Sequence, residues 1–221
     1  MTGRFAVIAA RAASWDPRWP EPDAGPEILR ERWISALGRT VECALAAVDE
    51  AGLPDPEGVA VALGSLCGTL VQTEYMVDVL SGDGRRFLDP TSFLHNNASS
   101  VAATIATGLG TRSWTSTSLG EHAGVDALRV GFRSSGPVVV GAFDWPTPFL
   151  RWWLAASGHE VSADRAAAAF LVLEPLERCR DRGATPLREL ASPADVPPIA
   201  GTPTSAVAPL FRLCSDIGSA E

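Results

Sequence analysis

Lysine is absent from this sequence, and all 18 of its basic residues are arginines. Without a lysine amine, the protein cannot form a Schiff base with a carbonyl substrate. It also cannot contain a phosphate-binding P-loop, because that motif depends on a lysine side chain. The composition therefore excludes two large classes of enzyme mechanism.

Cysteine and histidine are scarce, and their positions do not match a metal site. The four cysteines are far apart, form no CxxC pair and have no histidine nearby: Cys43, Cys67, Cys179 and Cys214. Zinc sites need closely spaced groups of such ligands. We therefore expect neither a metal nor another cofactor.

Long apolar runs are also missing. No run approaches the roughly 20 residues that a helix needs to cross a bilayer. The apolar run near the N-terminus is short and is interrupted by Arg11, which is typical of a first strand rather than of a signal peptide. We therefore predict a cytoplasmic protein with reduced cysteines and no membrane partner.

The charge of the chain is strongly negative. A net charge of −8 and a pI near 4.9 argue against nucleic acid or an anionic membrane surface as a partner. The 221 residues, of which 46% are hydrophobic and 20% are charged, suit one domain with a real core.

Apolar periodicity predicts alternating strands and helices. Short apolar runs bounded by glycine or proline are typical of buried strands, and apolar residues three and four apart are typical of helices. The predicted strands span residues 5–10, 59–64, 111–117, 137–143 and 165–174. The predicted helices span residues 27–52, 69–80, 98–107, 121–132 and 175–183, and residues 81–93 are predicted to form a loop. This order indicates a layered α/β fold.

The turn between the strand at 111–117 and the helix at 121–132 is the expected place for chemistry. In a strand–helix–strand unit, such a turn lies at the carboxyl end of a sheet strand. The residue there is Glu121, followed by His122. Adjacent residues on a helix face different directions, so we do not expect these two to form an acid–base pair.

The same stretch resembles the ketosynthases of the thiolase fold. In that family a nucleophilic cysteine at this turn precedes a glycine-containing helix and a buried strand that ends in an acidic residue. Residues 124–128 (GVDAL) and 141–144 (GAFD) match this frame, and the match places Glu121 where the cysteine belongs. Within the family, the lost cysteine and the GxDAL sequence resemble the chain length factor, the non-condensing partner of a ketosynthase in type II polyketide synthases.

The resemblance implies a thiolase-like fold of which this chain contains the N-terminal half only, a layered sheet with helices on both faces. It extends over residues 4–190, and we expect a domain at 1–190 followed by a proline-, alanine- and serine-rich tail at 191–221. Compact chain length factors of aryl polyene and other highly reducing systems are reduced in the same way. The apolar end of the tail, residues 207–214, is expected to dock either on its own domain or on a partner.

The resemblance also indicates which residues would line an acyl tunnel. In chain length factors, the helix that follows a G-S-x-x-G turn borders the tunnel between the two subunits and limits product length. The corresponding helix is 69–80, and one of its faces provides the gating candidates: Leu70, Thr73, Val77 and Leu80. The alternative is a stripe that faces the protein's own core. Cys67, in the preceding turn, is predicted to be a structural thiol because no histidine stands at a predictable place beside it.

The predicted function is therefore that of a non-catalytic chain length factor. It would form a heterodimer with a full-length ketosynthase, meet the acyl carrier protein and its acyl chain through that complex, and fix polyketide or polyene chain length. Two alternatives stay open: a malonyl-carrier-protein decarboxylase that uses Glu121, and a stand-alone binding scaffold. Glu121 could also act only as a helix-start residue, which the helix dipole would stabilise.

Overall fold

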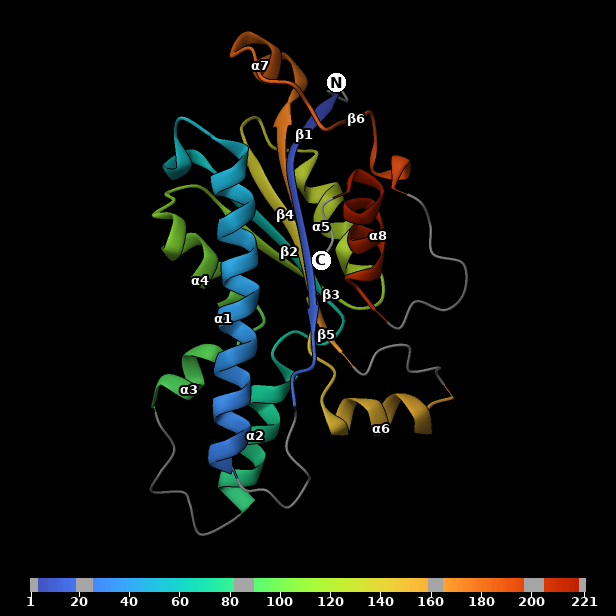
Figure 1. The fold of residues 1–221 in the computed structure, drawn as a ribbon. Coiled ribbons are helices and arrows are strands. Elements are labelled where there is room, and N and C mark those ends of the chain that lie inside the picture. Colours follow the sequence, from blue (N-terminus) through green and yellow to red (C-terminus); the bar gives the residue numbers. More distant parts are fainter. Residues whose placement is uncertain (1–3, 19–25, 82–89, 159–164, 197–204, 219–221) are drawn as a thin grey trace.

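A six-stranded sheet forms the centre of the molecule, with the strand order β3-β2-β4-β5-β1-β6 (Figure 1). The computed structural model describes residues 4–18, 26–81, 90–158, 165–196 and 205–218. The strands are β1 (Phe5–Trp15), β2 (Ala60–Ser65), β3 (Thr115–Leu119), β4 (Val138–Asp144), β5 (Ala166–Pro175) and β6 (Arg188–Leu190).

The strand directions place the carboxyl ends of four strands at the same end of the sheet. β2 is parallel to β3 and β4, β5 is antiparallel to β4 and β1, and β6 is antiparallel to β1. β1 consequently runs in the same direction as the three parallel strands. These four strands end at Trp15, Ser65, Leu119 and Asp144. The carboxyl ends of parallel strands are the usual ligand-binding edge of α/β proteins.

One face of the sheet is covered by α1 (Pro26–Ala51), α2 (Leu70–Ser81) and α4 (Ser100–Leu109), and α3 (Pro90–His95) packs against α2 and α4. Residues of α1 that are three or four apart are buried: Leu29, Trp33, Ala36, Thr40, Ala44, Ala47, Val48 and Ala51. The hydroxyl of Thr40 donates to the Ala36 carbonyl oxygen at 2.9 Å and accepts from Trp145 Nε1 at 3.1 Å. The hydroxyl group of Thr40 is thus satisfied inside the core.

The other face is covered by α5 (Ala123–Gly131) and α8 (Ala208–Ile217). α8 lies beside α5 and against β1 and β5 (Figure 1). The side chains of Leu210, Leu213 and Cys214 on α8 are fully buried. The predicted layered α/β fold with helices on both faces is confirmed. Of the two alternatives for residues 207–214, docking on the protein's own domain is correct.

Two glycines allow the start of α5 to lie against its neighbours without a gap. A Cβ atom on Gly64, in β2, would lie 2.3 Å from the backbone carbonyl carbon of Ala123. A Cβ atom on Gly124 would lie 2.1 Å from the backbone oxygen of Ala206. No side chain fits at either place, so glycine is needed for this close approach. The first turn of α5 is therefore held between β2 and the segment that leads into α8.

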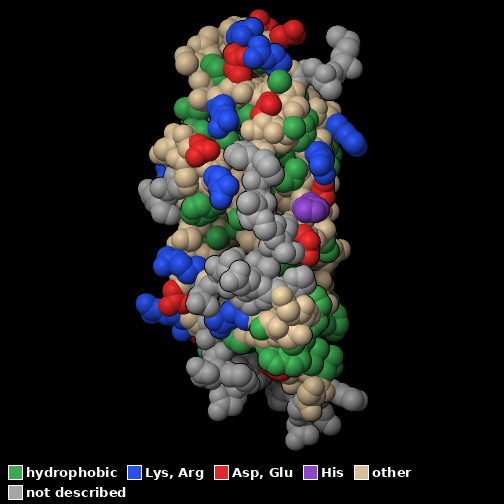
Figure 2. All heavy atoms as spheres, turned by 90° about the vertical axis from the view of Figure 1, so that its right-hand side faces the viewer, with side chains coloured by type: hydrophobic (Ala, Val, Ile, Leu, Met, Phe, Trp, Pro, Cys, Tyr) green, Lys and Arg blue, Asp and Glu red, His purple; other side chains and the backbone are tan. Residues whose placement is uncertain are grey.

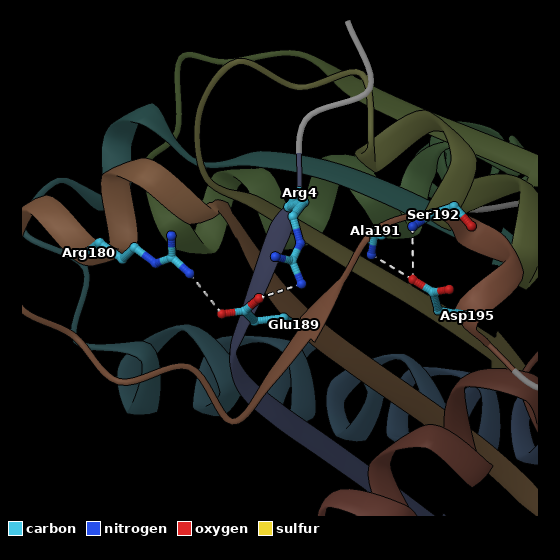
Figure 3. A network of polar contacts seen from close by, with 6 residues as sticks. All are labelled: Arg4, Arg180, Glu189, Ala191, Ser192 and Asp195. Carbon is cyan, nitrogen blue, oxygen red and sulfur yellow. Dashed lines mark hydrogen bonds and ion pairs between the residues drawn. The ribbon is translucent and has the colours of Figure 1, made fainter.

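Ion pairs fix β6 at the outer edge of the sheet (Figure 3). Glu189 of β6 forms an ion pair with Arg4 at 2.8 Å and another with Arg180 at 3.1 Å. Arg4 directly precedes β1, and Arg180 belongs to α7 (Leu176–Asp181). One carboxylate therefore joins the edge strand to two other elements.

Asp195, at the end of a short 3₁₀ helix after β6, caps the adjoining turn (Figure 3). Its Oδ2 accepts hydrogen bonds from the backbone N–H groups of Ala191 at 2.6 Å and Ser192 at 2.9 Å. These bonds favour the ionised form and lower the pKa of Asp195.

The predicted elements are present with shifted ends, and two predictions are wrong. The first strand does not stop at Ala10 but continues as β1 to Trp15, because residues 11–15 keep up the antiparallel pairing with residues 166–170 of β5. The loop predicted for residues 81–93 contains helix α3 from Pro90 onwards, whereas residues 82–89 lie outside the described part of the chain. β3 also begins later than predicted, at Thr115.

Candidate functional site

A groove of about 540 Å³ opens at the carboxyl ends of β2 and β3. The turn after β2, the start of α2, the α3–α4 region and the end of β3 border it. Its lining residues are Cys67, Thr69, Leu70, Thr73, Phe93, Asn96, Asn97, Ala98 and Leu119. Thr73 Oγ1 donates a hydrogen bond to Asn96 Oδ1 at 2.8 Å. This bond joins the two sides of the groove.

The outer face of α2 carries the four predicted gating residues. Leu70 and Thr73 line the groove, whereas Val77 and Leu80 lie farther along the helix with 54% and 44% of their surface exposed. The core-facing stripe of α2 consists of other residues: Val71, Gln72, Tyr75, Met76 and Val79. The alternative that the four predicted residues face the core is therefore wrong.

Cys67 lines the groove, but its thiol is not activated. Burial raises the pKa of Cys67 to about 11, and the carboxylates of Asp144 and Glu74 add to the rise. At neutral pH the side chain is therefore a neutral thiol, which is a poor nucleophile. This agrees with the structural role expected from the sequence.

Asp144, the last residue of β4, ties the end of β2 to the C-terminal segment. Its Oδ1 accepts a hydrogen bond from the backbone N–H of Leu66 at 2.8 Å. Its Oδ2 accepts from Ser205 Oγ at 2.8 Å and from the backbone N–H of Val207 at 3.1 Å. Burial raises the pKa of Asp144, and these donors oppose the rise. The carboxylate thus has a structural function beside the groove.

Glu74 is a half-buried carboxyl group on α2 that sequence reasoning missed. It accepts a hydrogen bond from Thr147 Oγ1, at the N-cap of α6 (Pro148–Ala156). Burial raises the pKa of Glu74 to about 7; the Thr147 bond opposes this rise and the charge of Asp78 adds to it. Glu74 therefore titrates near neutral pH at the contact between α2 and α6. No motif or periodicity marks it in the sequence.

Glu121 lies in the turn between β3 and α5, as predicted, and its side chain is exposed. α5 begins at Ala123, with His122 as its N-cap residue. Gly120 has a φ of +109°, a backbone conformation that glycine adopts without strain. A carboxylate near a helix start is stabilised by the dipole, but it does not form the durable thioester that a cysteine forms in acyl transfer.

Apolar side chains are exposed in the groove and on the helices that border it. Phe93 and Leu119 line the groove, Val77 and Leu80 lie farther along α2, and Leu94 lies on α3. Exposed apolar groups that adjoin one another mark interaction surfaces more often than isolated ones do.

The aromatic residues that follow Asp144 divide between core and surface. Trp145 is buried, with 4% of its surface exposed. The other three project from α6 into solvent: Phe149, Trp152 and Trp153. Figure 2 shows hydrophobic side chains gathered low on the face that it presents, where Figure 1 places α6.

Among the described residues, no three His, Cys, Asp or Glu side chains gather closely enough to hold a metal ion. Within the same ranges, no helix has the length and apolar character needed to span a bilayer.

Comparison with known proteins finds similarity in three dimensions only. No family model and no curated protein matches the sequence. A chain of the structure described as "AntDE:AntF (apo): type II PKS acyl-carrier protein in complex with its ketosynthase bound to the hexaketide" matches with a TM-score of 0.67 and 16% identity. The match covers 86% of this chain and 62% of that chain. This protein has the ketosynthase fold.

Two further structures with this fold contain a chain length factor. The ishigamide ketosynthase/chain length factor matches with a TM-score of 0.62 and 20% identity, over 86% of this chain and 62% of that chain. The ketosynthase (ApeO) in complex with its chain length factor (ApeC) from Xenorhabdus doucetiae matches with a TM-score of 0.52 and 18% identity, over 72% and 66%. This protein therefore spans less than two thirds of the length of the AntDE:AntF chain and of the ishigamide chain that it matches.

Proposed function

We propose that this protein is the non-catalytic chain length factor of a type II polyketide synthase. In this role it forms a heterodimer with a ketosynthase, provides one wall of the acyl tunnel and fixes the chain length of a polyketide or polyene. The observation that most supports the proposal is Glu121, which lies in the turn between β3 and α5. The sequence resemblance aligns this position with the nucleophilic cysteine of ketosynthases.

The chemistry near the groove supports a subunit that does not condense acyl groups. Condensation requires a thiolate that accepts the acyl chain as a thioester. Glu121 offers a carboxylate in place of that thiolate, and the thiol of Cys67 has its pKa raised to about 11. Neither side chain is suited to hold the growing chain covalently.

The lining of the groove supports a role in limiting the length of the acyl chain. Leu70, Phe93 and Leu119 give it apolar walls, as an acyl chain requires. The groove is open to solvent along the outer face of α2, so a second protein laid over it would convert it into a tunnel. Residues on that face would then limit how far the product extends.

The surface around the groove supports a protein partner. Exposed Phe93 and Leu119 line it, further exposed apolar residues lie on the bordering helices α2 and α3, and β3 is an edge strand that can pair with another chain. The solved relatives comprise a ketosynthase with its chain length factor and a ketosynthase with its acyl carrier protein. We assign the ketosynthase as the direct partner and the acyl carrier protein as a partner through the complex.

Co-expression with candidate ketosynthases from the same source tests this proposal. We expect the two chains to co-purify and to give the native mass of one or two 1:1 heterodimers. We expect this chain to be insoluble when it is expressed alone. A well-behaved monomer that retains none of the ketosynthases would contradict the proposal and would favour a stand-alone scaffold.

A further inference from the structure

A second pocket lies where β1 ends beside the N-terminal half of α1 and the start of β5 (Figure 1). It has a volume of about 430 Å³ and shares no lining residue with the groove. Its charged lining residues are Asp16, Arg18, Arg32, Arg39 and Arg165. Four guanidinium groups thus face one carboxylate, in a protein whose net charge is −8.

The fold gathers these arginines from distant parts of the sequence. Arg32 and Arg39 are seven residues apart on α1 and therefore share a helix face. Arg165 directly precedes Ala166, which pairs with Trp15 at the end of β1. Arg18 follows the same strand end. The concentration of positive charge is a product of the tertiary structure and not of a basic run.

Within the part of the chain that the structure describes, little negative charge offsets the four guanidinium groups. None of them forms an ion pair with a carboxylate among the described residues. Arg165 donates to the backbone oxygen of Ser14 at 3.0 Å, and the Arg39 guanidinium lies 5.8 Å from the ring centre of Trp15. The Nε of Arg32 is shielded from solvent and has no hydrogen-bond partner in the described part of the chain. A donor in that state favours an external acceptor.

Asp16 offsets only one of the four positive charges of this pocket, and one of its oxygens is engaged by the local backbone. Its Oδ1 accepts the backbone N–H of Arg18 at 2.8 Å. Arg18 has a φ of +48°, the one positive value for a non-glycine residue within the described ranges. The aspartate therefore stabilises the turn that brings Arg18 to the pocket.

A phosphate group matches this pocket better than other anions. The oxygens of a tetrahedral phosphate can accept bonds from several guanidinium groups at once, whereas a carboxylate is filled by one bidentate arginine. The volume suits a small molecule, and the negative charge of the whole chain disfavours nucleic acid. We propose that this pocket binds a small molecule through a phosphate or phosphate ester group. The inference does not depend on the function proposed above.

Calorimetric titration of the full chain, alone or in its ketosynthase complex, tests the inference. Inorganic phosphate and pyrophosphate are the probes, with ionic strength held constant by chloride. We expect saturable 1:1 binding that is tighter for pyrophosphate. The double substitution Arg32→Gln and Arg39→Gln should weaken it by about tenfold or more. Arg133→Gln, at an exposed position after α5, should leave it unchanged.

Three results would overturn the inference: no saturable binding of either probe, equal affinity in the wild type and the double variant, or equal binding of acetate. Melting curves check that the variants fold. If the first double variant does not fold, the double substitution Arg18→Gln and Arg165→Gln replaces it. Because these arginines lie outside the groove, ketosynthase binding should persist in all variants. Failure to bind a ketosynthase would leave the phosphate result standing.

Discussion

Glu74 is the side chain whose ionisation should be visible in the stability of the protein. Its pKa is about 7 in the folded protein, against an ordinary value of 4.5. A carboxyl group with a raised pKa favours folding while it is protonated, so its contribution is complete below pH 4.5 and is lost as the pH rises through 7. Stability should therefore fall across this interval.

Glu74→Gln should remove that loss, because glutamine imitates the protonated acid and can still accept the Thr147 hydrogen bond. We expect the variant to equal the wild type near pH 4.5 and to be more stable by about 1 kcal/mol near pH 8.5, a value reduced for partial solvent exposure. Denaturant unfolding at both pH values measures this. Glu42→Gln, at an exposed position of α1, is the control. An unchanged pH dependence in Glu74→Gln would show that the carboxyl is not the titrating group.

Cys67 should react slowly with thiol reagents. With its pKa raised to about 11, very little of it is thiolate near neutral pH. Brief treatment with iodoacetamide, followed by peptide mass spectrometry, should leave most of Cys67 unmodified, although it lines an open groove. Rapid and complete alkylation at neutral pH would instead identify an activated nucleophile.

The sequence predicts where a residue lies in the secondary structure better than it predicts which groups surround its side chain. Glu121 was placed correctly at its turn because the strand, glycine and helix signals are all local. The raised pKa of Glu74 could not be predicted, because it results from burial in the folded protein and is opposed by a bond from Thr147, which is 73 residues away. The arginine pocket was missed for the same reason, since β1, α1 and β5 come together only in the folded chain.

At the element scale, α8 is the helix on which the second face of the sheet depends. Leu213 is fully buried there, whereas Arg212 beside it is exposed. Leu213→Ala should lower the free energy of unfolding by roughly 3 kcal/mol, through lost burial and the cavity left behind. Arg212→Ala should change it little. Denaturant unfolding compares the two, and equal stability of both variants would show that α8 is not docked on the sheet.

Elements with strong periodicity were predictable, and those fixed by distant contacts were not. α1 shows apolar residues three and four apart over its whole length, and β4 is an apolar run preceded by Gly136-Pro137 and followed by Trp145-Pro146. Beyond Ala10, β1 contains an arginine and its apolar and polar residues alternate less clearly. Its length depends on its pairing with β5, which the local sequence does not show. α8 follows a proline-rich stretch whose composition resembles a linker, so its docking was left open.

At the scale of the whole molecule, the exposed surface around the groove should determine assembly. Val77 is more than half exposed, so Val77→Glu should not disturb the isolated fold. In a ketosynthase complex it would bury a charge without a partner, and we expect the affinity to fall by about tenfold or more. Ser215→Glu, at an exposed position of α8 on the opposite face of the sheet, should have no effect.

Co-purification and surface plasmon resonance with the ketosynthase compare these two variants. Equal loss of affinity in both would point to a general effect of added negative charge. Unchanged affinity in both would exclude the outer face of α2 from the interface.

The length of the product made by the reconstituted ketosynthase complex shows whether this protein sets chain length. Leu70 lines the groove, so Leu70→Trp should fill it and Leu70→Ala should enlarge it. We predict shorter products with Leu70→Trp and equal or longer products with Leu70→Ala, measured by mass spectrometry of the chains released from the carrier protein. An unchanged distribution in both variants, with the complex intact, would contradict a role for this protein in setting chain length.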